Sequence, residues 1–262
     1  MSTSGDALRF SRPPVRSVSL TVFFDKIEGL KLTSLAPLVT EIKKRFPQVQ
    51  ERFAELPWVL EEADDDASDI VPPGYLPFPY LSFANGSGQS INFQDDRFRV
   101  TWEFSDGADY PGFEDLKSDL QLHLRQFAEH VDSEVGSDLA TRHVRVRYDN
   151  DLGTSATPLE VMLRSYGADA RVRPSDEQGL PLTQPTFHAT VPVEGSISNT
   201  EVFILAVEDD QATRLTLRAS TAGVAGSGSD CWTLLDTAHN TLTQTFDQLS
   251  SVDQKEIWGV IQ

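Results

Sequence analysis

Arginine side chains recur at even spacing on three predicted strands, on the side away from the apolar residues. They are Arg97 and Arg99, Arg145 and Arg147, and Arg214 and Arg218. Residues two apart on a strand point to the same face, and arginine binds carboxylates and phosphates with a planar fork that lysine lacks. The favoured interpretation is that these arginines form ordinary cross-strand ion pairs with Glu103, Asp149 and Glu201. The alternative is that they form an arginine-bearing sheet face that binds an anionic small molecule or nucleic acid.

The sequence carries no signature of catalysis, metal binding or cofactor binding. It contains no P-loop, no G-x-S-x-G, no H-E-x-x-H and no dinucleotide fingerprint. His123 and His130 lie seven residues apart on one predicted helix, too far apart to share a metal without outside ligands. Cys231 has no cysteine partner. We expect no catalytic residues, no metal and no cofactor, and we keep an uncharacterised hydrolase as the third alternative.

The segment from Gln89 to Phe127 predicts a hairpin that leads into a helix. Apolar residues alternate with polar ones on both sides of Asp95-Asp96, at Ile91, Phe93, Phe98, Val100, Trp102 and Phe104. Beyond a breaker cluster, apolar residues take helical spacing at Phe113, Leu116, Leu120, Leu124 and Phe127. We expect Trp102 and Phe127 to be buried, each against the element that carries the other.

The same plan recurs near the C-terminus, which indicates an internal duplication. A second hairpin pattern surrounds Asp209-Asp210, and the helix after it places apolar residues at a constant offset from the first: Trp232, Leu235, Leu242 and Phe246 match Phe113, Leu116, His123 and Phe127. The predicted fold is α+β, with two related β-α-β-β-β-α halves whose antiparallel sheet carries long helices on one face. The halves span 15–133 and 138–262 within one compact unit, after an N-terminal tail at 1–14.

The rest of the sequence predicts two further helices and two long loops. A helix is expected over 35–53, broken into two pieces by Pro47. A short helix is expected over 158–165. Two proline-rich stretches, 56–80 and 171–185, read as long crossing loops. His239 lies on the last helix, where a cap or a hydrogen bond to a loop carbonyl is favoured over acid-base work.

Four motifs in fixed order support a resemblance to a known family. They are FQDDRFRVTWEF, YPGFEDL, YDND and the terminal LDTAHNTLTQTFDQLSSVDQKEIWG, which holds His239, Phe246 and Trp258. Together they resemble a sporadically distributed family of bacterial proteins of unknown function, with motifs DRF..W, YP.F..L, Y.N and AH…F..L…W. The resemblance implies structural roles for these three residues. Sporadic occurrence implies an accessory system of the defence or toxin-antidote type.

Composition narrows the partner classes. The 262 residues carry a formal net charge of −18, which disfavours non-specific binding to DNA or to an anionic membrane by the whole surface. No apolar run approaches the ~20 residues of a membrane span, and the N-terminus lacks a basic-then-apolar leader, so a cytoplasmic location is expected. The sequence therefore predicts a non-enzymatic binding protein that engages another macromolecule, with a protein partner favoured over an anionic small molecule or nucleic acid.

Overall fold

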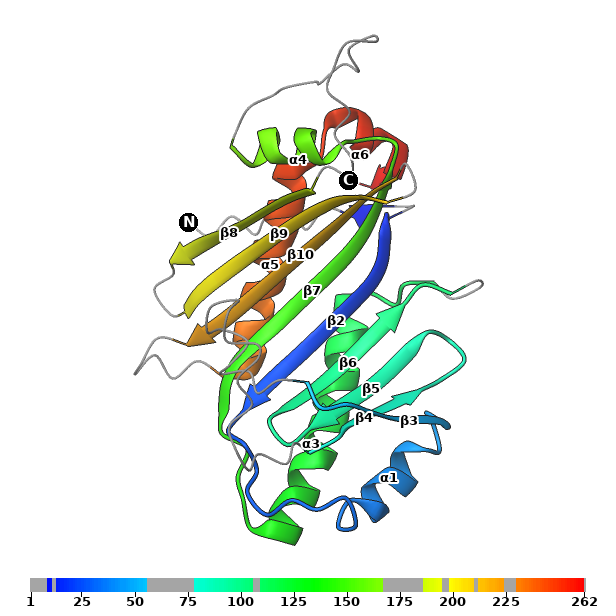
Figure 1. The fold of residues 1–262 in the computed structure, drawn as a ribbon, viewed down its shortest axis with the longest axis vertical. Coiled ribbons are helices and arrows are strands. Elements are labelled where there is room, and N and C mark those ends of the chain that lie inside the picture. The colour runs from blue at the N-terminus through cyan, green and yellow to red at the C-terminus, as the bar shows by residue number, and fades with distance from the viewer. Residues whose placement is uncertain are drawn as a thin grey trace. The chain divides into compact units, whose positions relative to one another are not determined.

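The fold is α+β and is built on a nine-stranded antiparallel sheet (Figure 1). The computed structural model describes residues 9–10, 13–55, 78–105, 109–166, 186–194, 198–209, 212–223 and 230–261. The predicted crossing loop 171–185 and most of 56–80 lie outside these residues. No helix in the described ranges is long and apolar enough to span a membrane.

The strand order in the sheet is β3-β4-β5-β6-β2-β7-β10-β9-β8. The strands are β2 (Val15–Phe24), β3 (Gln48–Arg52), β4 (Tyr80–Ala84), β5 (Gln89–Gln94), β6 (Arg97–Glu103), β7 (Thr141–Gly153), β8 (Thr186–Glu194), β9 (Ser198–Asp209) and β10 (Ala212–Gly223). The helices are α1 (Ala36–Ile42), α3 (Phe113–Val135), α4 (Pro158–Ser165), α5 (Cys231–Leu249) and α6 (Val252–Trp258). A separate two-stranded sheet pairs β1 (Arg9–Phe10) with β11 (Val260–Ile261).

The chain divides into two compact units. The first unit is Ser19–Arg145, and the second unit combines Met1–Val18 with Val146–Gln262. Strands β2 and β7 each contribute residues to both units.

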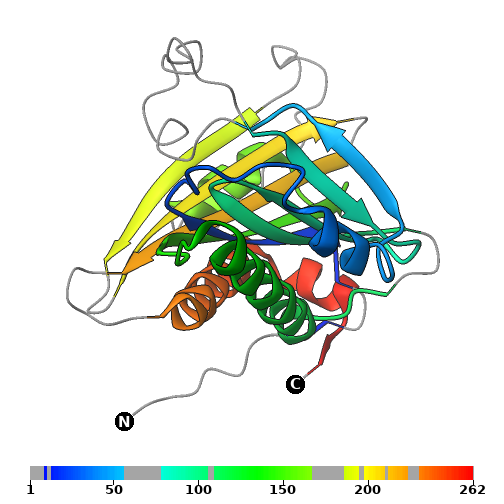
Figure 2. The same ribbon diagram turned by 90° about the horizontal axis from the view of Figure 1, so that it is seen from below.

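In the first unit, α3 packs against β6 (Figure 2). An aromatic cluster joins the helix to the sheet. The ring of Phe127 lies 5.2 Å from Phe93, 5.4 Å from Phe98 and 5.9 Å from Phe24, centroid to centroid. Phe127 is fully buried, and Trp102 is 2% exposed with its ring 5.1 Å from Tyr110. The apolar face of the predicted hairpin therefore lies against the apolar stripe of the predicted helix.

Two glycines make the first unit's turns feasible. A Cβ at Gly88 would lie 2.2 Å from the backbone oxygen of Glu103, so any side chain there would collide with the neighbouring strand. Gly136 ends α3 in the left-handed conformation, with φ 65°, and its N–H donates to the Asp132 carbonyl. The hairpin and the helix are both ended by positions that favour glycine.

The predicted helix over 35–53 is wrong beyond its first turns. The helix α1 ends at Ile42, and residues 48–52 form strand β3, which pairs antiparallel with β4 from Gln48↔Ala84 to Arg52↔Tyr80. Pro47 cannot donate the backbone hydrogen bond that a continuing helix needs, and the chain after it is extended at the sheet edge. The first half of the chain thus contains one more strand than the β-α-β-β-β-α plan.

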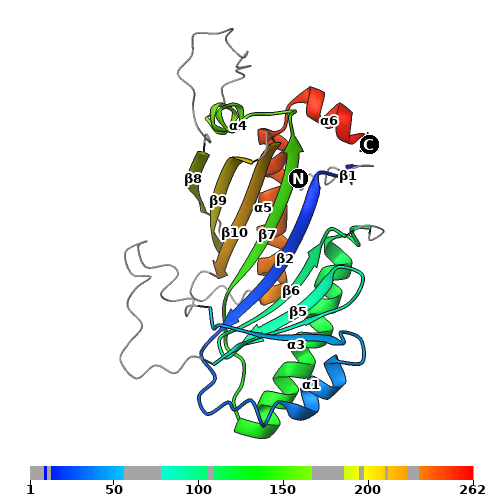
Figure 3. The same ribbon diagram turned by 45° about the vertical axis from the view of Figure 1, so that its right-hand side comes forward.

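In the second unit, α5 packs against β10 and β9, and α4 lies against β8, β9 and α5. The helix α4 occupies the predicted residues and starts with a capping box between Thr157 and Glu160. Near the end of α5, Phe246 stacks on Trp258 of α6 at 5.4 Å. Figure 3 shows β1 beside the end of the chain, so part of the predicted N-terminal tail forms a strand.

Candidate binding site: an arginine cluster on the first unit

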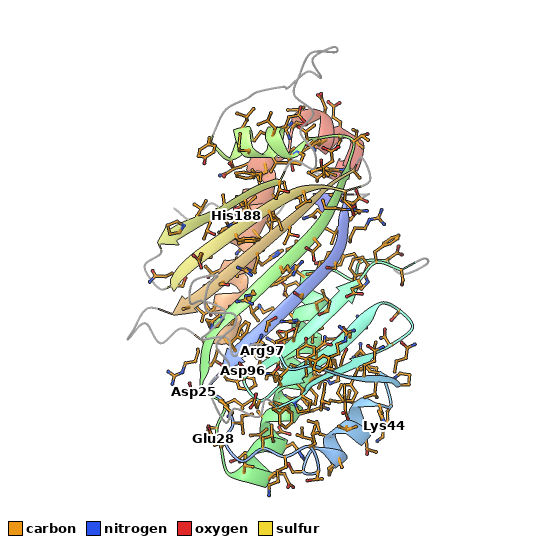
Figure 4. The ribbon with its side chains drawn as sticks, viewed as in Figure 1. Asp25, Glu28, Lys44, Asp96, Arg97 and His188 are labelled. Carbon is orange, nitrogen blue, oxygen red and sulfur yellow. The ribbon has the colours of Figure 1, made fainter. Side chains whose placement is uncertain are left out.

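Strand alternation places Arg97 and Arg99 on the sheet face opposite α3. Phe98 and Val100, between and after them, are buried among the apolar residues, and Phe98 contacts Phe127 of α3. In the register of the sheet, Arg97 is opposite Gln94 and Arg99 is opposite Asn92. Figure 4 marks Arg97 beside Asp96, at the turn between β5 and β6.

Both arginines bind the carboxylate of Glu55, which lies three residues after β3. Arg99 donates from Nη1 to Oε1 at 3.0 Å and from Nη2 to Oε2 at 2.9 Å, which is a bidentate pair. Arg97 donates from Nη1 to Oε2 at 2.7 Å. Arg97 also donates to the Asp96 carboxylate from Nε at 2.8 Å and from Nη2 at 3.1 Å. Arg97 therefore bridges two carboxylates while it is fully buried.

The remaining contacts fix the position of Arg99. Its Nη1 also donates to the Tyr80 hydroxyl at 3.0 Å, and its Nε donates to the Thr21 hydroxyl at 3.1 Å. Burial by itself lowers the pKa of Arg99, but the neighbouring Tyr80 and Glu55 outweigh it and leave that pKa raised. Burial raises the pKa of Tyr80 to about 12, although Arg99 acts in the opposite direction, so this hydroxyl stays neutral and accepts the arginine's hydrogen bond.

Gln94 holds the backbone of Glu55 in place. Its side-chain oxygen accepts from the Glu55 N–H at 2.9 Å, and its side-chain nitrogen donates to the Glu55 carbonyl at 3.1 Å. Gln94 is fully buried on β5. One amide side chain thus pairs with both backbone groups of the residue whose carboxylate the arginines bind.

Arg145 joins the same cluster through an aromatic ring. Its guanidinium carbon lies 4.8 Å from the centroid of Phe23, and that of Arg97 lies 5.1 Å from the same ring. The imidazole of His143 stacks on Phe23 at 4.1 Å. Three of the six predicted arginines, Arg97, Arg99 and Arg145, therefore gather around β2 within the first unit.

The other three predicted arginines lie on the second unit. Arg147 donates to Asp149 on its own strand at 2.9 Å, and Arg214 donates to Asp151 at 2.6 Å. The guanidinium of Arg218 lies 4.6 Å from the Phe203 ring. Of the predicted carboxylate partners only Asp149 forms an ion pair in the described part of the chain. Arg97, Arg99 and Arg214 bind Glu55, Asp96 and Asp151 instead of Glu103 and Glu201.

His239 contacts a tyrosine of the sheet. Its Nδ1 lies 3.0 Å from the hydroxyl of Tyr148 on β7, so the described contact joins α5 to the sheet. The histidine of the terminal motif and the tyrosine of YDND therefore meet. Among the residues that the structure describes, no group of three or more His, Cys, Asp or Glu side chains could hold a metal ion.

The turn next to the cluster is buried, which is unusual for two consecutive aspartates. Asp95 and Asp96 are 3% and 4% exposed, because the chain leaving β2 crosses the turn. The Phe24 N–H donates to the Asp96 carbonyl at 3.0 Å, and the Ile27 N–H donates to the Asp95 carbonyl at 2.8 Å. Burial, and then the charge of Asp96, raise the pKa of Asp95 to about 6. Oδ1 of Asp95 has no hydrogen-bond partner within the described residues.

Replacing Asp95 with Asn is expected to stabilise the protein at neutral pH but not in acid. The folded state holds the Asp95 proton more tightly than the unfolded state, so the wild-type free energy of unfolding falls as pH rises from about 4 through about 6. The amide lacks this ionisation, and the expected gain above that window is about 1–3 kcal/mol. Denaturant titrations of the wild type and of Asp95→Asn from pH 4 to 8 measure this difference in the free energy of unfolding.

Asp25→Asn is the control for this experiment, because its hydrogen bond with Arg142 lowers the pKa of Asp25. The ionised Asp25 carboxylate stabilises the folded state above the ordinary carboxylate pKa, and this effect is lost as pH falls. Asp25→Asn should therefore lower the free energy of unfolding at neutral pH, whereas Asp95→Asn raises it. Parallel pH profiles for the wild type and Asp95→Asn would contradict the assignment.

Sequence reasoning found the arginines of this site but missed Glu55, Gln94 and Tyr80. Gln94 directly precedes the predicted turn and has the sequence pattern of an ordinary hairpin residue, and Glu55 lies 39 residues before it. No family model matches the chain, and no curated protein matches it significantly.

Proposed function

We propose that this protein is a non-enzymatic binding protein that engages another macromolecule, with a protein as the favoured partner. The arginine cluster of the first unit is the observation that supports the proposal best, because charge-assisted, bidentate contacts to a carboxylate are the chemistry of recognition. A bacterial source and a role in a defence or toxin-antidote system follow from the motif resemblance. They form part of the same proposal, as does the cytoplasmic location expected from the sequence.

The proposal includes an internal duplication, with related halves at 15–133 and 138–262 and long helices on one sheet face. The strand order supports it. From the middle of the sheet outward, β2-β6-β5-β4 on one side matches β7-β10-β9-β8 on the other, and α3 and α5 follow corresponding strands. The two halves should superpose with Leu116 over Leu235 and Phe127 over Phe246.

Affinity capture from the native host, followed by mass spectrometry, tests the proposed function. We expect the wild-type chain to retain a protein in stoichiometric amount. Arg147→Gln, which alters only an exposed pair with Asp149, should retain the same protein in the same amount. Recovery of nucleic acid or a nucleotide instead of a protein would contradict the proposal.

A second candidate function is recognition of an anionic small molecule or nucleic acid along the arginine-bearing face. The approach of Arg97 and Arg145 to the single ring of Phe23 favours it. Titration of the wild-type protein with nucleotides and oligonucleotides at low and high salt distinguishes this candidate, since such binding weakens steeply with salt.

A further inference from the structure

Glu55 is held in its site as a separate ligand would be. Its carboxylate accepts three hydrogen bonds from the two arginines of β6, and its backbone N–H and carbonyl pair with the Gln94 side chain of β5. The side chains that bind it therefore all come from the sheet. Each polar group of one amino-acid residue, both in the backbone and in the side chain, meets a matching group on that surface.

The buried ion pairs of the site are better explained by a role in binding than by a role in stabilising the fold. A buried ion pair is frequently no more stabilising than well-packed apolar residues of similar volume, because both charges lose their hydration. Exposure also differs across the cluster: the side chain of Arg97 is fully buried, that of Arg99 is 20% exposed and that of Glu55 is 33% exposed. The carboxylate is thus the member nearest to solvent, and the arginines form the floor of the site.

We infer that Arg97, Arg99 and Gln94 form a binding site for a glutamate residue in an extended segment of the partner protein, and that Glu55 is its internal occupant. The planar fork of Arg99 selects a carboxylate. Gln94 selects a peptide, because it pairs with an N–H and a carbonyl that a free organic acid does not carry in that arrangement. Tyr80 and Thr21 hold the Arg99 guanidinium in the required orientation. This inference rests on the proposed function and names the chemistry of the partner.

Titration calorimetry of the Glu55→Ala variant of the 262-residue chain tests the inference. The probes are acetyl-Phe-Ala-Glu-Leu-amide, which copies the chain around Glu55, the same peptide with Gln in place of Glu, and acetate. Loss of the internal carboxylate leaves the backbone of residue 55 paired with Gln94 but without the three bonds to the arginines, so the glutamate peptide can displace it. The peptide should therefore bind the variant at least tenfold more tightly than it binds the wild type, or about 1.4 kcal/mol. The glutamine peptide should bind at least tenfold more weakly than the glutamate peptide, and Gln94→Leu added to the variant should remove the advantage of the peptide over acetate.

Asp119→Ala is the matched control. It removes the carboxylate from another bidentate pair, in which Arg45 donates to Asp119 at 2.8 and 3.1 Å, but no glutamine amide is bound to the Asp119 backbone in the described residues. The inference would be overturned if Asp119→Ala bound the glutamate peptide as tightly as Glu55→Ala does. It would also be overturned if Glu55→Ala bound the glutamate and glutamine peptides equally, or if folded Glu55→Ala bound neither. If acetate binds as tightly as the glutamate peptide does, the site is assigned to small carboxylates instead.

If Glu55→Ala does not fold, Glu55→Gln is titrated in its place and judged by the same outcomes. Captured partner protein without any peptide binding would remove this inference and leave the proposed function standing.

Discussion

Arg97→Met is expected to lower the free energy of unfolding by about 3–5 kcal/mol, because it removes one side of a buried ion-pair network. Arg97 is fully buried and donates to both Asp96 and Glu55. Methionine fills a similar volume but leaves the Asp96 carboxylate buried at the turn without its bidentate partner. Urea denaturation followed by circular dichroism measures the loss.

The matched control for Arg97→Met is Arg147→Met. Arg147 also donates twice to an aspartate close along the chain, but its side chain is 49% exposed. An exposed pair contributes about 0–1 kcal/mol, so this variant should melt close to the wild type. Similar losses for the two variants would show that burial of the network does not determine its contribution.

Phe127→Ala is expected to cost about 3–5 kcal/mol, since it opens a cavity in the aromatic cluster of the first unit. The lost ring is in contact with Phe24, Phe93 and Phe98, which come from three different strands. The remaining rings cannot close the space without moving those strands. Thermal and urea unfolding of the variant measure the cost.

Phe246→Ala provides the comparison at the position that the proposed duplication makes equivalent. Phe246 is only part-buried and stacks on Trp258, so its truncation should cost no more than about 2 kcal/mol. A loss for Phe246→Ala as large as for Phe127→Ala would contradict the difference in burial.

Periodicity alone located most of the elements near the cluster. The helical stripe that starts at Phe113 and the alternation around Asp95-Asp96 correspond to α3 and to the β5–β6 hairpin. Strand β3 was missed because its sequence, QVQER, has a single apolar residue and is exposed along its whole length at the sheet edge. Its place depends on pairing with β4, which no local pattern records.

Only part of the candidate site could be predicted, because local sequence patterns do not record contacts between distant segments. Spacing by two put Arg97 and Arg99 on one face, since that follows from strand geometry. Their shared partner was not predictable, because Glu55 reaches them only through a long-range approach of the chain after β3. The burial of Asp95 and Asp96 also depends on a distant segment, the exit from β2, so a turn that reads as exposed is enclosed.

The division of the chain has a consequence for its synthesis. The first unit is one continuous stretch, Ser19–Arg145, whereas the second unit needs Met1–Val18 together with Val146–Gln262. On the ribosome the first unit can therefore complete its contacts while β7 is still emerging, but the residues of β2 before Ser19 must wait for the later part of β7, where Asp149 and Asp151 bind Ser17 and Arg16. We expect ribosome-bound chains in which Arg145 has just left the exit tunnel to protect the first unit from proteases and to leave the residues of β2 before Ser19 open to cleavage.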